Sequence, residues 1–592
     1  MFYRSLTEEQ SVRVRRARPV IALALVAFAI GAIVGANSGS SASDALAARF
    51  VAAWSRGDYA AMYADVDPTT KRSLTADGFA AAYAEAMRTA TATSLRALGK
   101  PRSAPGGYVS VPISVSTRLF GALRLEMRLH VIGDAEGGEA IAWSPSLAFP
   151  GMQPGETLTR QTALPPRAKL LARDGSVLAE GNPSEAGTRS SPLGAVASAV
   201  IGEVGPIPGS RRAALEAQGV PTNAIVGTSG LERALDAQLR GTPGGELLAG
   251  HRVLASAPPH AAHSVRTTVS PAVQQAAVAA LGSQLGGVVA LDPSSGQILA
   301  VAGIGLNSVQ PPGSTFKMVT LTGVLSAHVA TPATVFPYAT YATLDGVKLS
   351  NANGEECGGS LALAFAVSCN SVFTPLGVKL GASRLVAMAE RFGFNHEPGV
   401  EGAAESTLPA ASSIQGELDV GSTAIGQGQV QASALEMAIV AASIADGGRR
   451  PRPTFTPAPA AAGAYVTSTD VAHTVRRLMI EVVRKGTGAS AAIPGVTVAG
   501  KTGTAELKTE CSSSPTGESQ SGEAAKHETE SGSGCAGAAN EASNTDAWFA
   551  SFAPALSPRI AVCVLLVKDG AGGATAAPVA REVLEAGLKA SR

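Results

Sequence analysis

The sequence predicts a multidomain α+β protein with a membrane anchor at its N-terminus. The chain has 592 residues, more than one domain usually holds, and 45% of them are apolar, so several cores can be buried. One uncharged apolar run follows an arginine-rich start, and helix-like and strand-like stretches fill the rest of the chain. The net charge of +1 and the lack of a basic patch interleaved with aromatic residues argue against a nucleic-acid partner.

The apolar run extends from Val20 to Ala36 and follows four arginines between positions 13 and 18. Its length corresponds to a helix of roughly 25 Å, at the short end of what crosses a bilayer. The arginines predict a cytoplasmic tail over 1–18, a transmembrane signal anchor over 19–36 and an exported remainder. A cleaved signal peptide is the alternative, because residues 34–36 suit a signal peptidase. In both cases we expect most of the chain on the extracytoplasmic face of the cell membrane.

Two N-terminal modules follow the anchor. Residues from about 45 to 100 have the periodicity of amphipathic helices, and the alternating runs YVSVPISVST and ALRLEMRLHVIG predict strands of a curled sheet. We therefore expect a small α+β domain over 41–155. The region 156–262 is rich in Pro and Gly and contains only short elements, so it predicts an extended connecting module.

Residues 263–592 predict the largest domain. It begins with a strand (SVRTTVS), a helix and a hairpin (GGVVALDPSSGQILAVAG), and hydrophobic helices continue to Gly447. After these helices, the pattern predicts three further strands, in VTVAGKTGTAEL, AWFASFAP and RIAVCVLLVKD. Residues 507–545 contain six Glu against two Lys and predict a disordered acidic insertion. We expect this insertion either to form a flap over the adjacent cleft or to be an inert surface loop.

The five cysteines fit an oxidising compartment. Cys357 and Cys369 are close in sequence, as are Cys511 and Cys535, so we expect two local disulfides and a free, buried Cys563. Sequence alone does not fix the connectivity. A structural zinc is the other interpretation of clustered cysteines, but no CxxC or paired histidine accompanies them. We therefore expect no metal and no cofactor.

Ser314 is the candidate nucleophile. It lies in PPGSTFKMVTLTGVL, where Pro and Gly precede an apolar helix, and the first turn of a helix favours developing negative charge. Lys317 follows one turn later, and of the twelve lysines it alone stands three residues after a serine. A lysine can take the serine proton only when it is neutral. Burial and a second lysine nearby would lower its pKa from the usual value of about 10.4.

Two further motifs accompany this pair. Ser368-Cys369-Asn370 offers a second hydroxyl to relay protons and an amide that can both donate to and accept from a peptide. Lys501-Thr502-Gly503-Thr504 offers a glycine-bearing strand that an extended peptide can join, with a lysine and hydroxyls suited to a carboxylate. Each motif is weak alone, but their order within one domain predicts a serine acyl-transferase.

The combination Ser-x-x-Lys, Ser-x-Asn, Lys-Thr-Gly resembles that of penicillin-binding proteins and serine β-lactamases. IGQGQVQASALEMA and DAWFASFAP are similar to the penicillin-binding transpeptidase domain, and GTSGLERALDAQLRG to the pedestal of class B, monofunctional, members. The 41–155 region is similar to the NTF2-like N-terminal domain of the subgroup that includes low-affinity, resistance-type transpeptidases. The resemblance implies a dimerisation-like pedestal over 156–262 and, over 263–592, a β-lactamase-like antiparallel sheet flanked by helices.

The resemblance also implies a role for each motif residue. Ser314 would be acylated, and Lys317 would be its base. Ser368 would relay the proton to the leaving D-alanine, and Asn370 would hold substrate amides. Lys501, a second lysine, completes the set. Thr502, Gly503 and Thr504 would bind the carboxylate side of the substrate. The backbone N–H groups of Ser314 and Thr504 would form the oxyanion hole.

The implied activity is a D,D-transpeptidase that cleaves D-Ala-D-Ala, holds the acyl group on Ser314 and passes it to an amine of a second peptidoglycan stem peptide. Expected partners are stem peptides, β-lactams, the membrane and a partner glycosyltransferase. Hydrolysis, as in a D,D-carboxypeptidase or β-lactamase, and a non-turnover β-lactam sensor or scaffold are the alternatives. Gly303 stands where class A β-lactamases would carry the deacylating glutamate before Leu306-Asn307, which favours transfer over hydrolysis.

Overall fold

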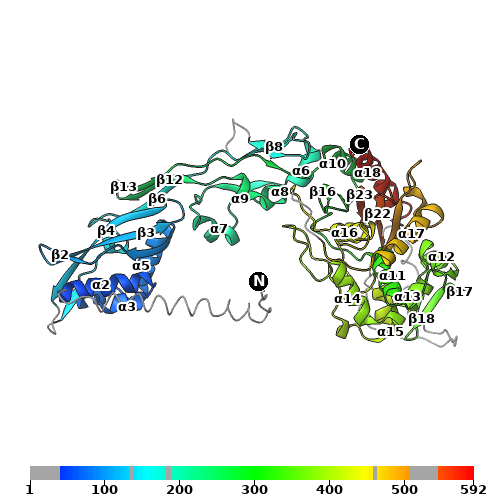
Figure 1. Cartoon of the computed structure of the whole chain (residues 1–592), viewed down its shortest axis with the longest axis horizontal. Coiled ribbons are helices and arrows are strands. Elements are labelled where there is room, and N and C mark those ends of the chain that lie inside the picture. Colours follow the sequence, from blue (N-terminus) through cyan, green and yellow to red (C-terminus); the bar gives the residue numbers. More distant parts are fainter. Residues whose placement is uncertain (1–40, 134–137, 182–187, 458–462, 507–543, 592) are drawn as a thin grey trace, which may run out of the picture. The chain divides into compact units, whose positions relative to one another are not determined.

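The computed structural model describes residues 41–133, 138–181, 188–457, 463–506 and 544–591 (Figure 1). These residues form two compact units. The first unit contains the described residues of 41–165, 209–224 and 242–260, and the second contains those of 166–208, 225–241 and 261–591. The expected tail and anchor (1–18 and 19–36) and nearly all of the expected insertion (507–543) lie outside the described residues.

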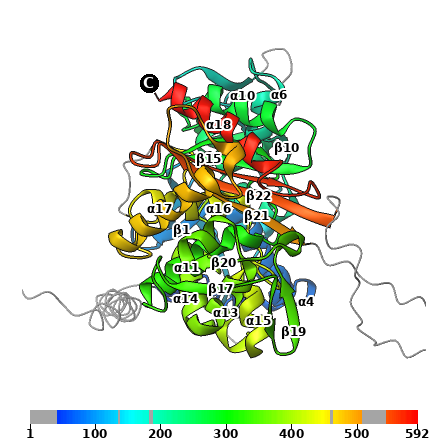
Figure 2. The ribbon, with the colours of Figure 1, turned by 90° about the vertical axis from the view of Figure 1, so that its right-hand side faces the viewer.

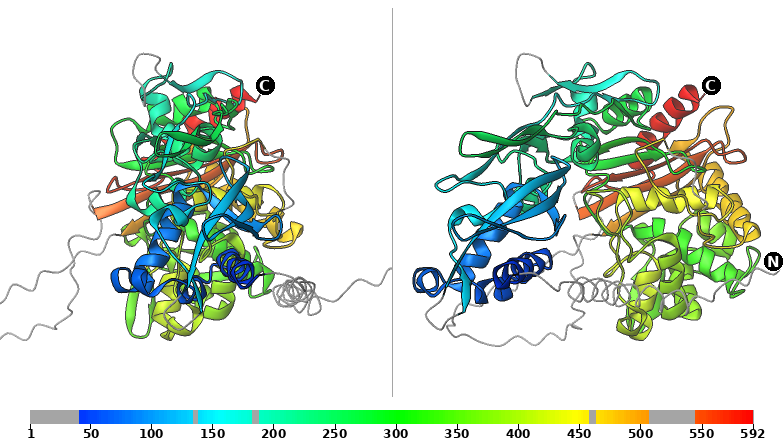
Figure 3. Two further views of the ribbon diagram at one scale, coloured as in Figure 1. Left: turned by 90° about the vertical axis from the view of Figure 1, so that its left-hand side faces the viewer. Right: turned by 60° about the vertical axis from the view of Figure 1, so that its left-hand side comes forward.

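In the first unit, short helices share one hydrophobic core with an antiparallel sheet (Figure 3). Helices α2 (Ala42–Ser55), α3 (Tyr59–Ala64) and α5 (Ala76–Thr89) contribute to this core, whereas α4 (Pro68–Ser73) has no buried residue. Each begins at a polar side chain that accepts a hydrogen bond from the first turn, as Asp67 does from the N–H groups of Thr69 and Thr70. Such caps satisfy N–H groups that have no partner within the helix.

The sheet of this core has the order β1-β3-β4-β5, with β2 paired to β3. A second, three-stranded sheet has the order β13-β12-β6. The strands are β1 (Ala92–Ala97), β2 (Arg102–Ala104), β3 (Tyr108–Thr117), β4 (Ala122–Gly133), β5 (Glu139–Ile141), β6 (Leu158–Ala163), β12 (Gly244–Ala249) and β13 (Arg252–Ala257), and the remaining helix is α7 (Gly209–Glu216). Helices followed by a sheet are what the sequence predicts for this region.

The second unit begins with a part made of short strands. A sheet has the order β14-β7-β8-β9, and β10 pairs with β11. The strands are β7 (Leu170–Leu171), β8 (Val177–Gly181), β9 (Arg189–Ser190), β10 (Val204–Pro206), β11 (Ile225–Gly227) and β14 (Val265–Arg266), and the helices are α6 (Ala195–Ile201), α8 (Gly230–Ala234) and α9 (Asp236–Leu239). The strand expected at SVRTTVS is much shorter, because Thr267 still donates its N–H to Leu171 but Thr268 donates to Phe455 and leaves the ladder.

The main sheet of the second unit is antiparallel and has the order β16-β15-β23-β22-β21. Its strands are β15 (Gly286–Leu291), β16 (Ile298–Gly303), β21 (Ala499–Glu506), β22 (Thr545–Ala553) and β23 (Ile560–Leu566). Helices α10 (Pro271–Leu281) and α18 (Ala576–Ala590) lie on one face, and α16 (Ala434–Ala445) lies on the other (Figure 2). The antiparallel sheet flanked by helices that the family resemblance implied for this region is confirmed.

Burial on both faces explains the unbroken apolar runs of these strands. Along β15, Val288 and Ala290 belong to the core with α10 and α18, whereas Val289 and Leu291 belong to the core with α16. All seven residues of β23 are buried. Burying one such aliphatic side chain contributes about 1.5–3 kcal/mol. The two cores together make the sheet a rigid platform for the helices above it.

The α16 side of the sheet also carries the helices and hairpins between β16 and β21. The helices are α11 (Lys317–Ser326), α12 (Leu361–Ala366), α13 (Asn370–Leu380), α14 (Ala382–Phe392), α15 (Gly416–Ala424) and α17 (Thr469–Lys485). Two strand pairs connect α11 to α12, namely β17 (Val335–Ala339) with β20 (Cys357–Ser360), and β18 (Tyr341–Leu344) with β19 (Val347–Ser350). We call Val335–Ser360 the β17–β20 insert.

Within the described residues no single helix is both long and apolar enough to cross a membrane. Helices α13 and α14 reach that length and composition only together, across a bend of 100°. Most of their apolar side chains are buried in the core beside α16.

A buried cluster of charged side chains lies in the strand-rich part of the second unit. Glu232 accepts hydrogen bonds from Arg167 at 2.6 Å and from Arg189 at 2.7 Å, and its own side chain is 0% exposed. Asp236 accepts from Arg167 and from Arg240, each at 2.8 Å. Charges at this depth are tolerated because each carboxylate has two cationic partners.

Replacing one member of this cluster should therefore be costly. We expect Glu232→Ala to lower the free energy of unfolding of the second unit by about 3–5 kcal/mol, because two buried guanidinium groups lose their shared carboxylate. Urea denaturation measures this change. Glu401→Ala is the matched control, because Glu401 pairs at 2.9 Å with Arg233 while both side chains are 48% exposed, and it should cost less than about 1 kcal/mol. Equal losses in the two variants would contradict the prediction.

Candidate active site

Ser314 lies in a tight 3₁₀ turn, Gly313–Phe316, that leads directly into α11. The sequence predicts the first turn of an α-helix here, but the turn is tighter, with the Thr315 hydroxyl donating to the Pro312 carbonyl. Gly313 has a φ of +50°, and a Cβ atom there would lie 2.8 Å from the carbonyl oxygen of Thr504. Glycine thus lets the nucleophile turn contact the backbone of β21.

Lys317 is the first residue of α11, and its side chain is completely buried. Its ammonium nitrogen donates to the Ser368 carbonyl at 2.7 Å and to Oδ1 of Asn370 at 2.6 Å. The Ser368 hydroxyl lies 3.4 Å from the same nitrogen. Within the described residues the Ser314 hydroxyl makes no hydrogen bond, and the side-chain hydrogen bonds of Lys317 all go to the Ser-x-Asn motif. The structure therefore brings two of the three predicted motifs into direct contact.

Lys501 brings the third motif to the same point. It lies on β21, is completely buried, and donates to the Ser368 hydroxyl at 2.8 Å and to the Thr502 carbonyl at 3.0 Å. The Ser368 hydroxyl therefore lies between the amines of Lys317 and Lys501. A single hydroxyl between two amines can pass a proton from one to the other.

Burial lowers the pKa of both lysines. Desolvation, followed by the positive charge of Lys501, holds the pKa of Lys317 well below its usual value. Desolvation lowers the pKa of Lys501 to about 7. The amine of Lys317 lies over the ring of Phe373 and that of Lys501 over the ring of Phe365, 5.5 and 5.6 Å from the ring centres. Near neutral pH, a lysine in this setting can accept a proton.

The Lys-Thr-Gly-Thr segment occupies the edge strand of the described sheet, because β21 pairs with β22 and with no other described strand. A Cβ atom at Gly503 would lie 2.7 Å from the Pro312 carbonyl oxygen, so glycine is required where β21 meets the nucleophile turn. The Thr502 hydroxyl pairs with the Thr487 hydroxyl, and Oγ1 of Thr504 accepts from the Gly572 N–H at 3.4 Å. An edge strand of this kind can accept a peptide as an additional strand.

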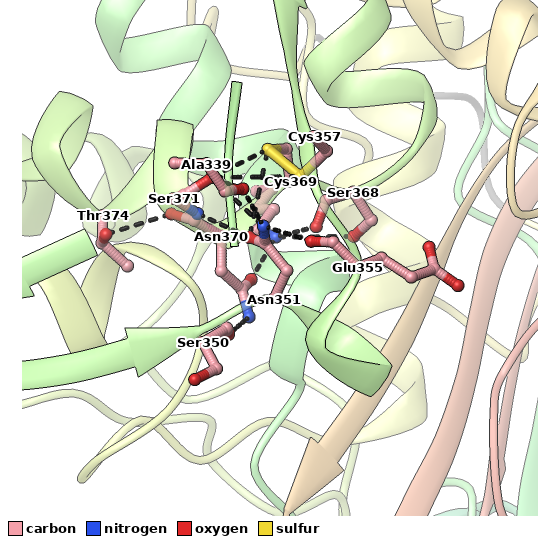
Figure 4. The surroundings of a disulfide bond; sticks show 11 residues. Ala339, Ser350, Asn351, Glu355, Cys357, Ser368, Cys369, Asn370, Ser371 and Thr374 are labelled. Atoms are coloured by element: carbon pink, nitrogen blue, oxygen red, sulfur yellow. Dashed lines mark hydrogen bonds between the residues drawn. A yellow bond between two sulfur atoms is a disulfide. The ribbon is translucent and has the colours of Figure 1, made fainter. Parts of the chain in front are cut away.

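A disulfide joins Cys357 on β20 to Cys369, the middle residue of the Ser-x-Asn motif (Figure 4). Cys563 is free and buried. Cys511 and Cys535 lie outside the described residues. No group of three or more His, Cys, Asp or Glu in the described part of the chain could hold a metal ion.

Some residues that shape this site carried no signal in the sequence. Asn351 and Ser350 contact the Ser-x-Asn motif, Thr487 pairs with Thr502, and the rings of Phe365 and Phe373 cover the two lysines. The two residues of each contact lie 15 to 136 positions apart in the chain, so no local pattern could identify them. Asn370 also differs from expectation, because both ends of its amide bond to protein groups, Lys317 and Ser350.

Three family models match the chain. The penicillin-binding protein transpeptidase domain matches residues 286–585, the penicillin-binding protein dimerisation domain matches 182–249, and the NTF2-like N-terminal transpeptidase domain matches 42–156. A relative from Mycobacterium tuberculosis, named peptidoglycan D,D-transpeptidase PbpA, is 32% identical over 55% of this chain and 72% of its own length.

Solved structures are similar over most of their length. A D,D-transpeptidase domain from Eggerthella lenta is 29% identical with a TM-score of 0.56, over 72% of this chain and 98% of that one. The penicillin G acyl-enzyme complex of M. tuberculosis penicillin-binding protein A is 28% identical with a TM-score of 0.54, over 72% and 99%. The chain is therefore a member of the penicillin-binding protein transpeptidase family, of the class B type with an NTF2-like N-terminal domain.

Proposed function

We propose that the chain is a peptidoglycan D,D-transpeptidase that forms an acyl-enzyme on Ser314 and is acylated there by β-lactams. One observation carries this proposal: Lys317, one turn after Ser314, is completely buried beside a second buried lysine, and the Ser368 hydroxyl joins the two amines. This arrangement favours a neutral amine one helical turn from Ser314, and serine acylation requires such a base.

In the acylation step, the Ser314 oxygen attacks the carbonyl carbon of the penultimate D-alanine while Lys317 takes the hydroxyl proton. The carbonyl oxygen becomes negative and is held by the backbone N–H groups of Ser314 and Thr504. Collapse breaks the peptide C–N bond, and Ser368 passes the proton to the nitrogen of the leaving D-alanine. In the transfer step an acceptor amine attacks the ester, and Ser314 recovers its proton.

The edge position of β21 supports an extended binding mode for the donor peptide. A peptide that pairs with this edge would run past the nucleophile turn, with the positive charge of Lys501 available for its terminal carboxylate. Asn370 would then act mainly by holding Lys317, its hydrogen-bond partner at 2.6 Å. A β-lactam carries the same carbonyl and carboxylate, but its leaving nitrogen stays attached after the ring opens.

The proposal extends to the cellular setting of the enzyme. The arginine-rich start and the apolar run over 19–36 support a single-pass membrane anchor with the remainder of the chain outside the cytoplasm. We divide that remainder into an NTF2-like domain over 41–155, a pedestal over 156–262 and a transpeptidase domain over 263–592. A glycosyltransferase that supplies uncross-linked glycan strands is the partner that a monofunctional transpeptidase requires.

Replacing the nucleophile tests the function directly. We expect Ser314→Ala to abolish both the penicillin adduct seen by intact-mass spectrometry and the exchange of terminal D-alanine for a labelled D-amino acid in a stem pentapeptide. The control is Ser557→Ala, which changes an exposed serine and should leave both activities intact. An adduct that persists on Ser314→Ala would refute the assignment, and rapid release of the wild-type adduct by water would favour the hydrolase.

The two lysines predict a pH dependence with two limbs. Acylation should decline towards acid pH as Lys317 becomes protonated and can no longer accept the serine proton. It should also decline above about pH 7, because Lys501 then loses the charge that attracts the carboxylate. Penicillin acylation rates from about pH 5 to about pH 9 check this. Lys501→Arg keeps its charge and should lose the decline above neutrality; a wild-type rate that is flat with pH would contradict both assignments.

A further inference from the structure

The Ser-x-Asn turn, residues 368–370, is attached to the β17–β20 insert at three points (Figure 4). The Asn370 amide donates from Nδ2 to the Ser350 carbonyl at 2.8 Å. The N–H of Ser371 donates to Oδ1 of Asn351 at 2.8 Å. The disulfide joins Cys357 of the insert to Cys369. Each attachment therefore involves either a residue of the turn or Ser371, which directly follows it.

Asn351 is the central residue of these attachments. Its side chain is 6% exposed, and its Nδ2 group donates to the carbonyls of Ala339 at 2.7 Å and Glu355 at 2.8 Å. These two bonds fix the amide within the insert, so that Oδ1 points to the start of α13. The side chain is thus held by the insert and presents one acceptor to the turn.

That acceptor replaces a missing helix cap. The N-cap position of α13 is Cys369, whose side chain makes no capping hydrogen bond, and its sulfur is already used in the disulfide. The first N–H groups of a helix need an acceptor from elsewhere. Asn351 supplies one to Ser371 from eighteen positions before Cys369 in the chain. The start of α13 therefore depends on the insert.

The start of α13 also sets the surroundings of Lys317. Ser368 adopts a φ of +63°, a left-handed conformation that is unfavourable for a residue other than glycine. This conformation directs the Ser368 carbonyl to Lys317 and its hydroxyl to Lys501. A strained turn keeps such a conformation only where its neighbours hold it.

We propose that Asn351 and the Cys357–Cys369 disulfide are positioning residues for the acylation of Ser314, because together they hold the Ser368–Asn370 turn in the conformation that surrounds Lys317. This inference rests on the proposed function. Among the described contacts none of the three residues is hydrogen-bonded to Ser314, and they act on the reaction through Ser368 and Asn370. Their loss should slow the chemical step and leave the initial, noncovalent binding of a β-lactam largely unchanged.

Quench-flow intact-mass measurements with benzylpenicillin on the full chain separate these two quantities, namely k2, the acylation rate at saturation, and Kd of the noncovalent complex. For Asn351→Ala we expect k2 to fall about 10- to 100-fold, the loss typical of a misplaced catalytic group, with Kd within about twofold. Glu356→Ala is the matched control, because it removes an exposed side chain from the same segment, makes none of these contacts and should change neither quantity.

Reduction provides a test that does not depend on the folding of a variant. Dithiothreitol should lower k2 of the folded wild-type chain, and reoxidation should restore it. The same response in a Cys511→Ser/Cys535→Ser background assigns the effect to Cys357–Cys369. Unchanged k2 in both Asn351→Ala and the reduced protein would overturn the inference, as would a loss confined to Kd. A wild-type chain that forms no adduct would instead refute the proposed function.

Discussion

The site depends on one physical constraint, which is the burial of two lysine amines without a carboxylate partner among the described contacts. The acceptors of Lys317 and Lys501 are neutral: two carbonyls, one amide oxygen and one hydroxyl. Removing an ammonium group from water costs several kcal/mol unless it loses its proton or gains a counter-ion. The neutral form of Lys317 is therefore favoured, and the same burial that costs stability supplies the base that we propose. Lys501, whose pKa is lowered to about 7, keeps part of its charge at neutral pH. The charge cluster around Glu232 differs, because each carboxylate there has cationic partners. Burial in that cluster therefore creates no proton acceptor.

Such a site needs a rigid frame, because each lysine amine would regain hydration if it could relax towards water. The main sheet provides it through two cores, one on each face, and it places Lys501 on β21. Helix α11 provides Lys317 from within the core beside α16, where nine of its ten residues are buried. Ser368 and Cys369 of the Ser-x-Asn turn lie outside regular structure, between the end of α12 and the start of α13 at Asn370. That turn is consequently the part whose position has to be secured by other contacts.

The sequence could predict the motif residues but not what holds them. Ser314 and Lys317 are detectable because their spacing corresponds to one helical turn, and the strands of the main sheet are detectable because they are apolar on both faces. Their antiparallel order is implied only by the family resemblance. Asn351 has no such signal, since an Asn between a strand and a turn is common, and its role arises only when Ser371 folds against it. The same holds for Phe365 and Phe373, which in sequence are ordinary core aromatics. Tertiary contacts likewise ended the strand expected at SVRTTVS after two residues.

Main-chain contacts fix the spacing between Ser314 and β21. Gly313 contacts the backbone of Thr504, and Gly503 contacts that of Pro312, each too closely for a Cβ atom. Gly426 adds a third such contact, because a Cβ atom there would lie 2.2 Å from the Gly313 carbonyl oxygen, and its own carbonyl accepts from the Gly313 N–H at 3.0 Å. Backbone held against backbone on both sides of Ser314 leaves little freedom to that turn. An oxyanion hole built from the N–H groups of Ser314 and Thr504 would be equally rigid. Rigid N–H dipoles stabilise the charge of a transition state without having to reorganise.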